Sequence, residues 1–228
     1  MDISARAAKG ISIAAWAGAA FGTVFGQVHA LARIQAHPDD LVEAPLTKIW
    51  AVPAARALRP LLDWSDPNSV YLAWGKIWLP VCVAFTFAAA LVYQRRRPER
   101  AEKWLWRVAL TGYAAMTLSV AGDYFTPWMD QMFIAGIVAM LLIGLGGIPL
   151  GIVMLRNGFR PRTTAVLLTI FLPFLFAITM VTSMGSALLP LTWGWAIAAH
   201  AAVKRDAAVA AAAAAAAPAG RQTLVPRT

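Results

Sequence analysis

The side chains best suited to acid–base chemistry stand where predicted helices end. Asp123 closes one apolar segment and Asp130 opens the next, with tyrosine, threonine and tryptophan between them. Gln27, His29 and Lys76 lie near segment ends predicted to face the same side. Two carboxylates can divide the roles of acid and base when their environments differ, and an imidazole can assist proton transfer. If these helix ends converge, the chemistry they suit is proton transfer on a bound molecule.

A plainer interpretation of the two aspartates stays open. A carboxylate at the start of a helix, as predicted for Asp130, interacts favourably with the helix N-terminus and needs no other role. Asp123 would then be a solvated helix-end residue as well, and His29 a hydrogen-bonded packing residue. Catalytic residues are therefore unassigned, with Asp123, Asp130 and His29 as the candidates.

The sequence predicts no cofactor-binding residue and no metal site. Its histidines, His29, His37 and His200, fall at different predicted depths, whereas haem ligands in a membrane bundle share one level. The single cysteine, Cys82, excludes an intramolecular disulfide and a cysteine-based zinc or iron–sulfur site. The glycines of residues 144–151 lack the adjacent Lys-Ser/Thr pair of a phosphate-binding loop.

Six apolar segments must position these residues. The chain of 228 residues is 60% hydrophobic and 14% charged, and runs of about 20 apolar residues match the ~30 Å of hydrocarbon that a helix crosses. We therefore predict one all-α domain over residues 1–206, a polytopic transmembrane bundle of six spans. The spans are residues 11–32, 71–94, 104–123, 129–155, 163–183 and 186–203.

Two segments fall outside the predicted spans. Residues 34–70 are predicted to form one long extracytoplasmic loop. Its apolar residues could form a short helix lying in the membrane interface, although Pro53 and Pro60 would break or kink such a helix. Residues 207–228 are rich in alanine, which favours helix but offers nothing to pack against. We expect this stretch to be a disordered cytoplasmic tail.

Charges in the loops predict the orientation. With six spans, one side carries 15 Lys and Arg against four acids, and the other carries five against seven. Because Lys and Arg near helix ends favour the cytoplasm, both termini are predicted to be cytoplasmic and the protein to be a multi-pass plasma-membrane protein. No charge needs to lie at mid-membrane, which disfavours an ion-coupled pathway.

The first segment has two interpretations. Arg6 and Lys9 before an apolar run, with small residues at 30–32, resemble a cleaved signal peptide. Small residues at four-residue spacing instead suit a retained helix whose face packs closely on another, and we favour retention. The predicted helix-packing glycines are Gly18, Gly22, Gly26, Gly147 and Gly151.

The net charge of +9 indicates a lipid partner rather than nucleic acid. The basic residues gather at one predicted membrane face, where anionic lipid attracts them. No basic stripe with interleaved aromatic residues is present, so we expect no nucleic-acid binding. The expected partners are the lipid bilayer and, as a further candidate, other membrane proteins.

A glycine-rich segment, Gly147-Ile-Pro-Leu-Gly151, ends in an arginine- and proline-containing turn at 155–162 and is preceded by Gly122-Asp123-Tyr124. In these motifs the second half of the chain resembles a group of small, uncharacterised multi-pass membrane proteins of high-GC actinobacteria. The resemblance implies a membrane location and assigns no activity or site.

Three functional classes remain on these grounds. The first is a non-enzymatic binding or accessory component of the membrane. The alternatives are a small membrane enzyme acting on a lipid or isoprenoid-like substrate and a small permease. A deep apolar pocket lined by His29, Lys76 and Asp123 would favour the enzyme, whereas separated and solvated aspartates would count against it.

Overall fold

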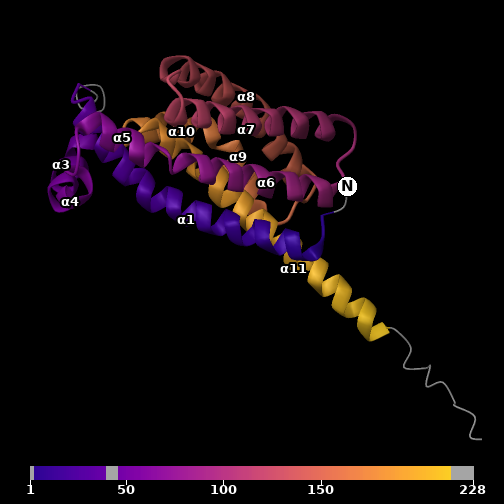
Figure 1. Cartoon of the computed structure of the whole chain (residues 1–228). Helices are drawn as coiled ribbons and strands as arrows, with labels where there is room; N and C mark the ends of the chain where they lie inside the picture. Colours follow the sequence, from indigo (N-terminus) through magenta and orange to yellow (C-terminus); the bar gives the residue numbers. More distant parts are fainter. Residues whose placement is uncertain (1–2, 40–45, 217–228) are drawn as a thin grey trace, which may run out of the picture.

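The computed structural model describes residues 3–39 and 46–216, and within those ranges the chain forms helices and no strand. Long helices lie side by side along one axis (Figure 1). In chain order the elements are α1 (Ala5–Ala36), α3 (Thr47–Ala57), α4 (Arg59–Leu62), α5 (Pro67–Gly75), α6 (Trp78–Arg96), α7 (Arg100–Phe125), α8 (Met129–Arg156), α9 (Arg162–Thr169), α10 (Phe171–Thr179), the 3-10 helix η1 (Met184–Leu188) and α11 (Leu189–Ala216).

Four of the described helical segments are long and apolar enough to cross a membrane. They are α1, α5 with α6, α8, and η1 with α11, and the bent pair α9–α10 makes a fifth if it acts as one span. The protein is therefore helical, with apolar helices of membrane-spanning length. Exposed large apolar side chains such as Ile13, Phe21 and Val24 on α1 fit a lipid-facing surface.

Helix α7 contains the predicted third span, but it is less apolar than the four candidate spans and is not among them. Its 26 residues suffice in length, but threonine, serine, tyrosine and glycine along it lower its mean hydropathy. Helix α8 follows it after a short turn and runs back along it (Figure 1). An added Cβ at Gly146 would stand 2.7 Å from the backbone nitrogen of Ala109, and one at Gly122 would clash with Met132. At Gly146 the two backbones therefore approach closely, and at Gly122 the Met132 side chain of α8 packs against the α7 backbone.

The predicted fifth span, residues 163–183, is broken. α9 and α10 meet at 59° around Ile170. Pro173 lies in the first turn of α10 and lacks the N–H that would continue the ladder to the carbonyl of Thr169. The proline thus accounts for two short helices in place of one.

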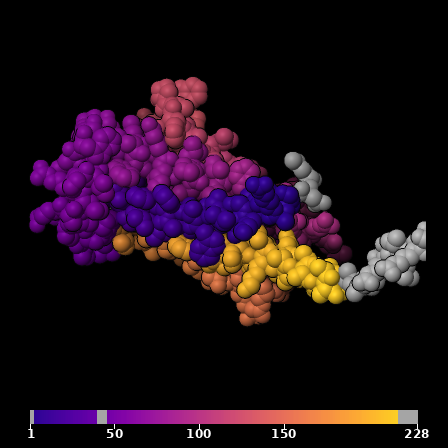
Figure 2. All heavy atoms as spheres, turned by 60° about the horizontal axis from the view of Figure 1, so that its bottom comes forward, coloured from indigo at the N-terminus to yellow at the C-terminus, as the bar shows by residue number. Residues whose placement is uncertain are grey.

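Helix α1 lies between α6 and α11 along one face (Figure 2). Its glycines face α6, and an added Cβ would stand 3.1 Å from Ala84 at Gly18, 3.4 Å from Val81 at Gly22 and 2.8 Å from the Trp78 ring at Gly26. The four-residue spacing therefore lets α6 approach α1.

The two predicted packing glycines of α8 differ. A Cβ at Gly151 would stand 2.6 Å from the carbonyl oxygen of Ala165 in α9, whereas a Cβ at Gly147 would meet only Leu168, at 4.0 Å. Close approach between α8 and α9 therefore depends on Gly151, and Gly147 has room for a side chain.

Two other predicted boundaries differ from the structure. The predicted tail from residue 207 continues α11 as an exposed helix to Ala216, since alanine readily extends a helix that packed residues have already nucleated; residues 217–228 lie outside the described residues. The predicted loop 34–70 contains the end of α1, all of α3 and α4, and the start of α5. Pro53 lies inside α3 without ending it.

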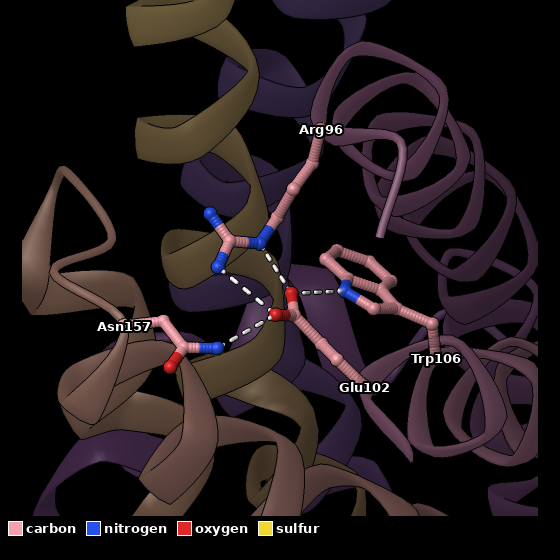
Figure 3. Close-up of polar contacts among 4 residues, drawn as sticks. All are labelled: Arg96, Glu102, Trp106 and Asn157. Atoms are coloured by element: carbon pink, nitrogen blue, oxygen red, sulfur yellow. Dashed lines mark hydrogen bonds and ion pairs between the residues drawn. The ribbon is translucent and has the colours of Figure 1, made fainter. Parts of the chain in front are cut away.

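An ion pair with supporting hydrogen bonds joins the helices at the end of the bundle where α6 ends and α7 begins. Glu102, near the start of α7, accepts hydrogen bonds from Arg96 on both carboxylate oxygens, from the indole N–H of Trp106 at 3.3 Å and from the Asn157 amide at 3.0 Å (Figure 3). Burial raises the pKa of Glu102, but the hydrogen bonds and the Arg96 charge outweigh burial and leave the pKa below its ordinary value. The carboxylate thus ties α6, α7 and the end of α8 together.

Candidate functional site

Two adjacent hollows lie at the end of the bundle that carries α3 and α5. The narrow cavity, about 60 Å³, is lined by α1, α5, α6, α7, α8 and η1 and includes His29, Tyr71 and Asp123 in its wall. The wide hollow, about 290 Å³, lies among α1, α3, α8 and the turn after α10. The wall residues common to both are Arg33, Phe133, Ser183 and Met184. The shared wall residues make the two hollows neighbours, and we treat them together as the candidate site.

His29 is the polar centre of the narrow cavity. Its side chain is buried, and the indole N–H of Trp78 donates to its Nδ1 at 3.1 Å. An indole nitrogen can only donate, so Nδ1 carries no proton and the imidazole is neutral with its proton on Nε2. Nε2 lies 3.1 Å from the Tyr124 hydroxyl oxygen, which therefore accepts that proton's hydrogen bond. The hydroxyl proton of Tyr124 is left to serve another acceptor.

Aromatic contacts hold the imidazole in this orientation. The His29 ring stacks on Tyr71 with centroids 5.1 Å apart, and Tyr124 meets it edge-on at 5.6 Å. Trp78 makes a third contact, edge-on at 6.4 Å. Rings packed on several sides cannot change rotamer without moving their neighbours, so the polar atoms of the cavity are preorganised.

Three glycines make room for these rings. A Cβ at Gly75 would stand 2.0 Å from the Tyr124 ring, and Cβ atoms at Gly26 and Gly185 would stand 2.8 and 2.9 Å from the Trp78 ring. Trp78 therefore lies between the α1 and η1 backbones, and Tyr124 lies against α5. Glycines far apart in the sequence thus make room for the Trp78 and Tyr124 side chains, which line the cavity.

Asp123 brings a carboxylate to the narrow cavity from the last turn of α7. The side chain is half-buried. Arg33 lines the same wall and brings a positive charge close enough to interact with this carboxylate. The carboxylate oxygens can accept hydrogen bonds from a bound molecule.

The wide hollow has two buried hydroxyl groups without partners. Within the described ranges, neither Thr47 Oγ1 of α3 nor Ser183 Oγ of the turn after α10 has a hydrogen-bond partner, and both residues line the wall. Most buried polar atoms in proteins are paired, because an unpaired one costs about 1–3 kcal/mol. Two of them in one wall are hydroxyl groups that a bound molecule could pair with once a small shift of the wall uncovers them.

Hydrogen bonds fix the turn that carries Ser183. The Gln27 amide of α1 donates to Ser186 at 3.2 Å and accepts from Thr182 at 2.9 Å. The Trp50 indole of α3 donates to the carbonyl of Val181 at 2.5 Å. The wall of the wide hollow is thereby attached to α1 and α3.

The structure separates the residues that the sequence grouped. His29 and Asp123 line one cavity. Lys76 lies outside the walls, with its ammonium 5.5 Å from the centroid of the Phe125 ring. Asp130 is exposed in the first turn of α8, and Gln27 braces the neighbouring turn rather than the cavity.

The sequence did not identify four of the wall residues as candidates: Tyr71, Trp78, Thr47 and Ser183. Their roles depend on contacts between elements distant in the chain, and an isolated aromatic or hydroxyl residue gives no signal of such contacts. Among the described residues, no group of three His, Cys, Asp or Glu side chains is placed to hold a metal ion. Cys82 is fully buried in α6.

Comparison of the chain with protein-family models, with curated proteins and with solved structures found no match. The function is therefore inferred from the site itself.

Proposed function

We propose that the protein is a six-span plasma-membrane component, with both termini cytoplasmic, that binds a small amphiphilic molecule in the narrow cavity and wide hollow without transforming it. The observation that carries the proposal is the pair of buried hydroxyls, Thr47 and Ser183, that lack partners in the wall of the wide hollow. A bound polar group would supply the missing hydrogen bonds.

The arrangement of the helices supports the six-span topology. α7 is about 39 Å long at 1.5 Å per residue, and it packs along α8, which is apolar enough to span. A helix that runs beside a spanning helix covers the same thickness. The start of α1, the α6–α7 loop and the end of α11 lie at one end of the bundle, and α3 and α5 lie at the other (Figure 1). This division matches the division of basic charge along the chain.

Cavity size and chemistry limit the ligand. The wide hollow, at about 290 Å³, is close to the lower bound of ~300 Å³ for small-molecule pockets. The narrow cavity has room for only a few atoms. A ligand would therefore lie mainly in the wide hollow, against Phe133 and Met184, and extend a hydrogen-bonding group toward Asp123 and Tyr124. This pattern suits an amphiphile with a hydroxyl or amine at its polar end.

A membrane enzyme is the second candidate. The hydrogen bonds from Trp78 to His29 and from His29 to Tyr124 leave Tyr124 with a phenolic proton to donate, and Asp123 brings a carboxylate to the wall of the same cavity. Such a set could donate and accept protons. It would act on the same class of amphiphile, so the two candidates differ in whether the bound molecule changes.

The test measures which small molecules co-purify with the protein in mild detergent. The wild type should retain an amphiphile enriched over the membrane extract. Thr47→Val with Ser183→Ala, and separately Asp123→Asn, should lose most of it. Asp130→Asn is the matched control, since that carboxylate is exposed and outside the walls, and it should retain the molecule.

A second readout separates binding from folding. Thr47 and Ser183 have no hydrogen bond to lose, so their double variant should unfold at the same or a higher temperature than ligand-free wild type. No enrichment in the wild type, or equal loss in Asp130→Asn, would contradict the proposal. Accumulation of one lipid and depletion of another in Asp123→Asn cells would favour the enzyme instead.

A further inference from the structure

A second pocket lies at the opposite end of the bundle and is walled by arginines. It has a volume of about 260 Å³ and lies where α6 ends, the turn between α8 and α9 passes, and α11 leaves the bundle. We call it the arginine pocket. Its wall residues are Val92, Arg95, Arg96, Gly158, Phe159, Arg160, Ala202, Arg205 and Asp206.

The charge of this pocket is unbalanced. Four guanidinium groups face one carboxylate, Asp206, which leaves the walls at +3 (four minus one). Glu102 behind Arg96 reduces the sum to +2 but is not a wall residue. Gathering like charges around a hollow costs energy, and a bound anion offsets that cost.

Two of the arginines are held in place. Arg95 forms an ion pair with Asp206 at 3.0 Å and donates to the carbonyl of Ile3. Arg96 is bonded to Glu102 on two nitrogens and stacks over the Phe159 ring at 5.2 Å. Its third nitrogen points away from Glu102 (Figure 3). Each guanidinium has five N–H donors, so both keep donors for a ligand.

The other two arginines stand at the mouth of the pocket. Arg160 and Arg205 are exposed, and the Arg205 guanidinium donates to the backbone carbonyl of Arg160 at 3.3 Å. That contact draws the turn and α11 together. Planar guanidinium forks match the geometry of phosphate oxygens, which is why arginine is favoured at phosphate sites.

Three apolar residues complete the wall of the pocket, but they present little surface, so the lining is mainly polar. Val92, Phe159 and Ala202 are buried, and the surrounding helices are apolar along their lengths. An arginine-walled pocket at the end of a bundle of apolar helices fits a lipid whose headgroup meets the arginines while its chains follow the helix surface outside the pocket. A free ion would use the arginines alone.

We propose that the arginine pocket binds the phosphate of an anionic phospholipid headgroup. The proposal does not depend on the ligand of the narrow cavity and wide hollow. Under the proposed topology the pocket faces the cytoplasmic leaflet, where anionic lipid gives the surface its negative potential.

The test titrates delipidated protein in neutral detergent with lipid and follows binding by native mass spectrometry. Phosphatidylglycerol should bind about tenfold more tightly than phosphatidylcholine. Arg160→Gln with Arg205→Gln should remove that preference. Arg156→Gln with Lys204→Gln removes the same charge at the same end without touching a wall, and should keep the preference.

Two further experiments distinguish the shape of the guanidinium group from its charge, and a lipid ligand from free phosphate. Arg160→Lys with Arg205→Lys keeps the charge but loses the planar fork, and should fall between wild type and the glutamine variant. Inorganic phosphate at millimolar concentration should not displace the lipid. Displacement by phosphate would assign the pocket to a free anion and overturn the lipid proposal. Equal binding of both lipids, or equal loss in the wall and control variants, would overturn it as well.

Discussion

At the scale of residues, the Trp78 indole N–H determines which nitrogen of His29 carries the proton. Trp78 can only donate, so its bond to Nδ1 leaves the His29 proton on Nε2 and directs it to Tyr124. The imidazole is therefore a fixed element of a hydrogen-bonded chain rather than a free base. Both of its ring nitrogens are engaged, Nδ1 by Trp78 and Nε2 by Tyr124.

Removing that hydroxyl should destabilise the protein. Tyr124→Phe leaves the buried His29 Nε2–H without an acceptor, which should lower the free energy of unfolding by about 0.5–1.5 kcal/mol in detergent. Tyr93→Phe is the control, because the Tyr93 hydroxyl has no hydrogen bond among the described residues. Equal effects of the two changes would show that the His29–Tyr124 bond contributes nothing.

Glu102 should make stability depend on acid pH. Its pKa is lower in the folded protein than in the unfolded chain, so the stabilisation is complete above the ordinary glutamate value of about 4.3. It is lost as the pH falls through the folded-state value. Thermal unfolding should therefore show the wild type above Glu102→Gln near neutral pH, with the difference shrinking below about pH 4.3. A difference that stays constant down to the acid limit would contradict this account.

At the scale of elements, the helices could be located from the sequence more completely than their contacts. Apolar runs gave the positions of α1, α6, α8 and α11, and the four-residue spacing of Gly18 to Gly26 identified the face of α1 that meets α6. The break at Ile170 follows from Pro173, but its angle depends on packing. Gly75 and Gly185 shape the site through Tyr124 and Trp78, which no local pattern links.

The two glycines of α8 should respond oppositely to the same change. Gly151→Ala places a methyl group against the Ala165 carbonyl and should cost about 1–3 kcal/mol of unfolding free energy. Gly147→Ala makes only an ordinary contact with Leu168 and should be neutral or stabilising by up to about 1 kcal/mol through helix propensity. Chemical denaturation of the two variants in one detergent makes the comparison. Equal stability would mean that α8 and α9 do not pack as closely as these contacts imply.

At the scale of the whole molecule, the two ends of the bundle have different chemistry. One end carries the aromatic and hydroxyl-lined hollows with Asp123, and the other carries Glu102 and the arginine pocket. This polarity agrees with the division of charge along the sequence. Asp123 and His29 could be placed near one another from predicted helix ends, whereas Asp130 and Lys76 could not be excluded without side-chain positions. The central claim is that α7 crosses the membrane, since the six-span topology and the opposite sides of the two sites depend on it.

Cysteine accessibility tests that claim most directly. Single-cysteine variants Ser65→Cys, Pro127→Cys and Glu99→Cys, all at exposed positions, are made in a Cys82→Ala background and treated with a membrane-impermeant maleimide. Positions 65 and 127 should react in intact cells, and position 99 only after permeabilisation. Reaction of positions 99 and 127 from the same side would show that α7 does not cross, and would contradict the account.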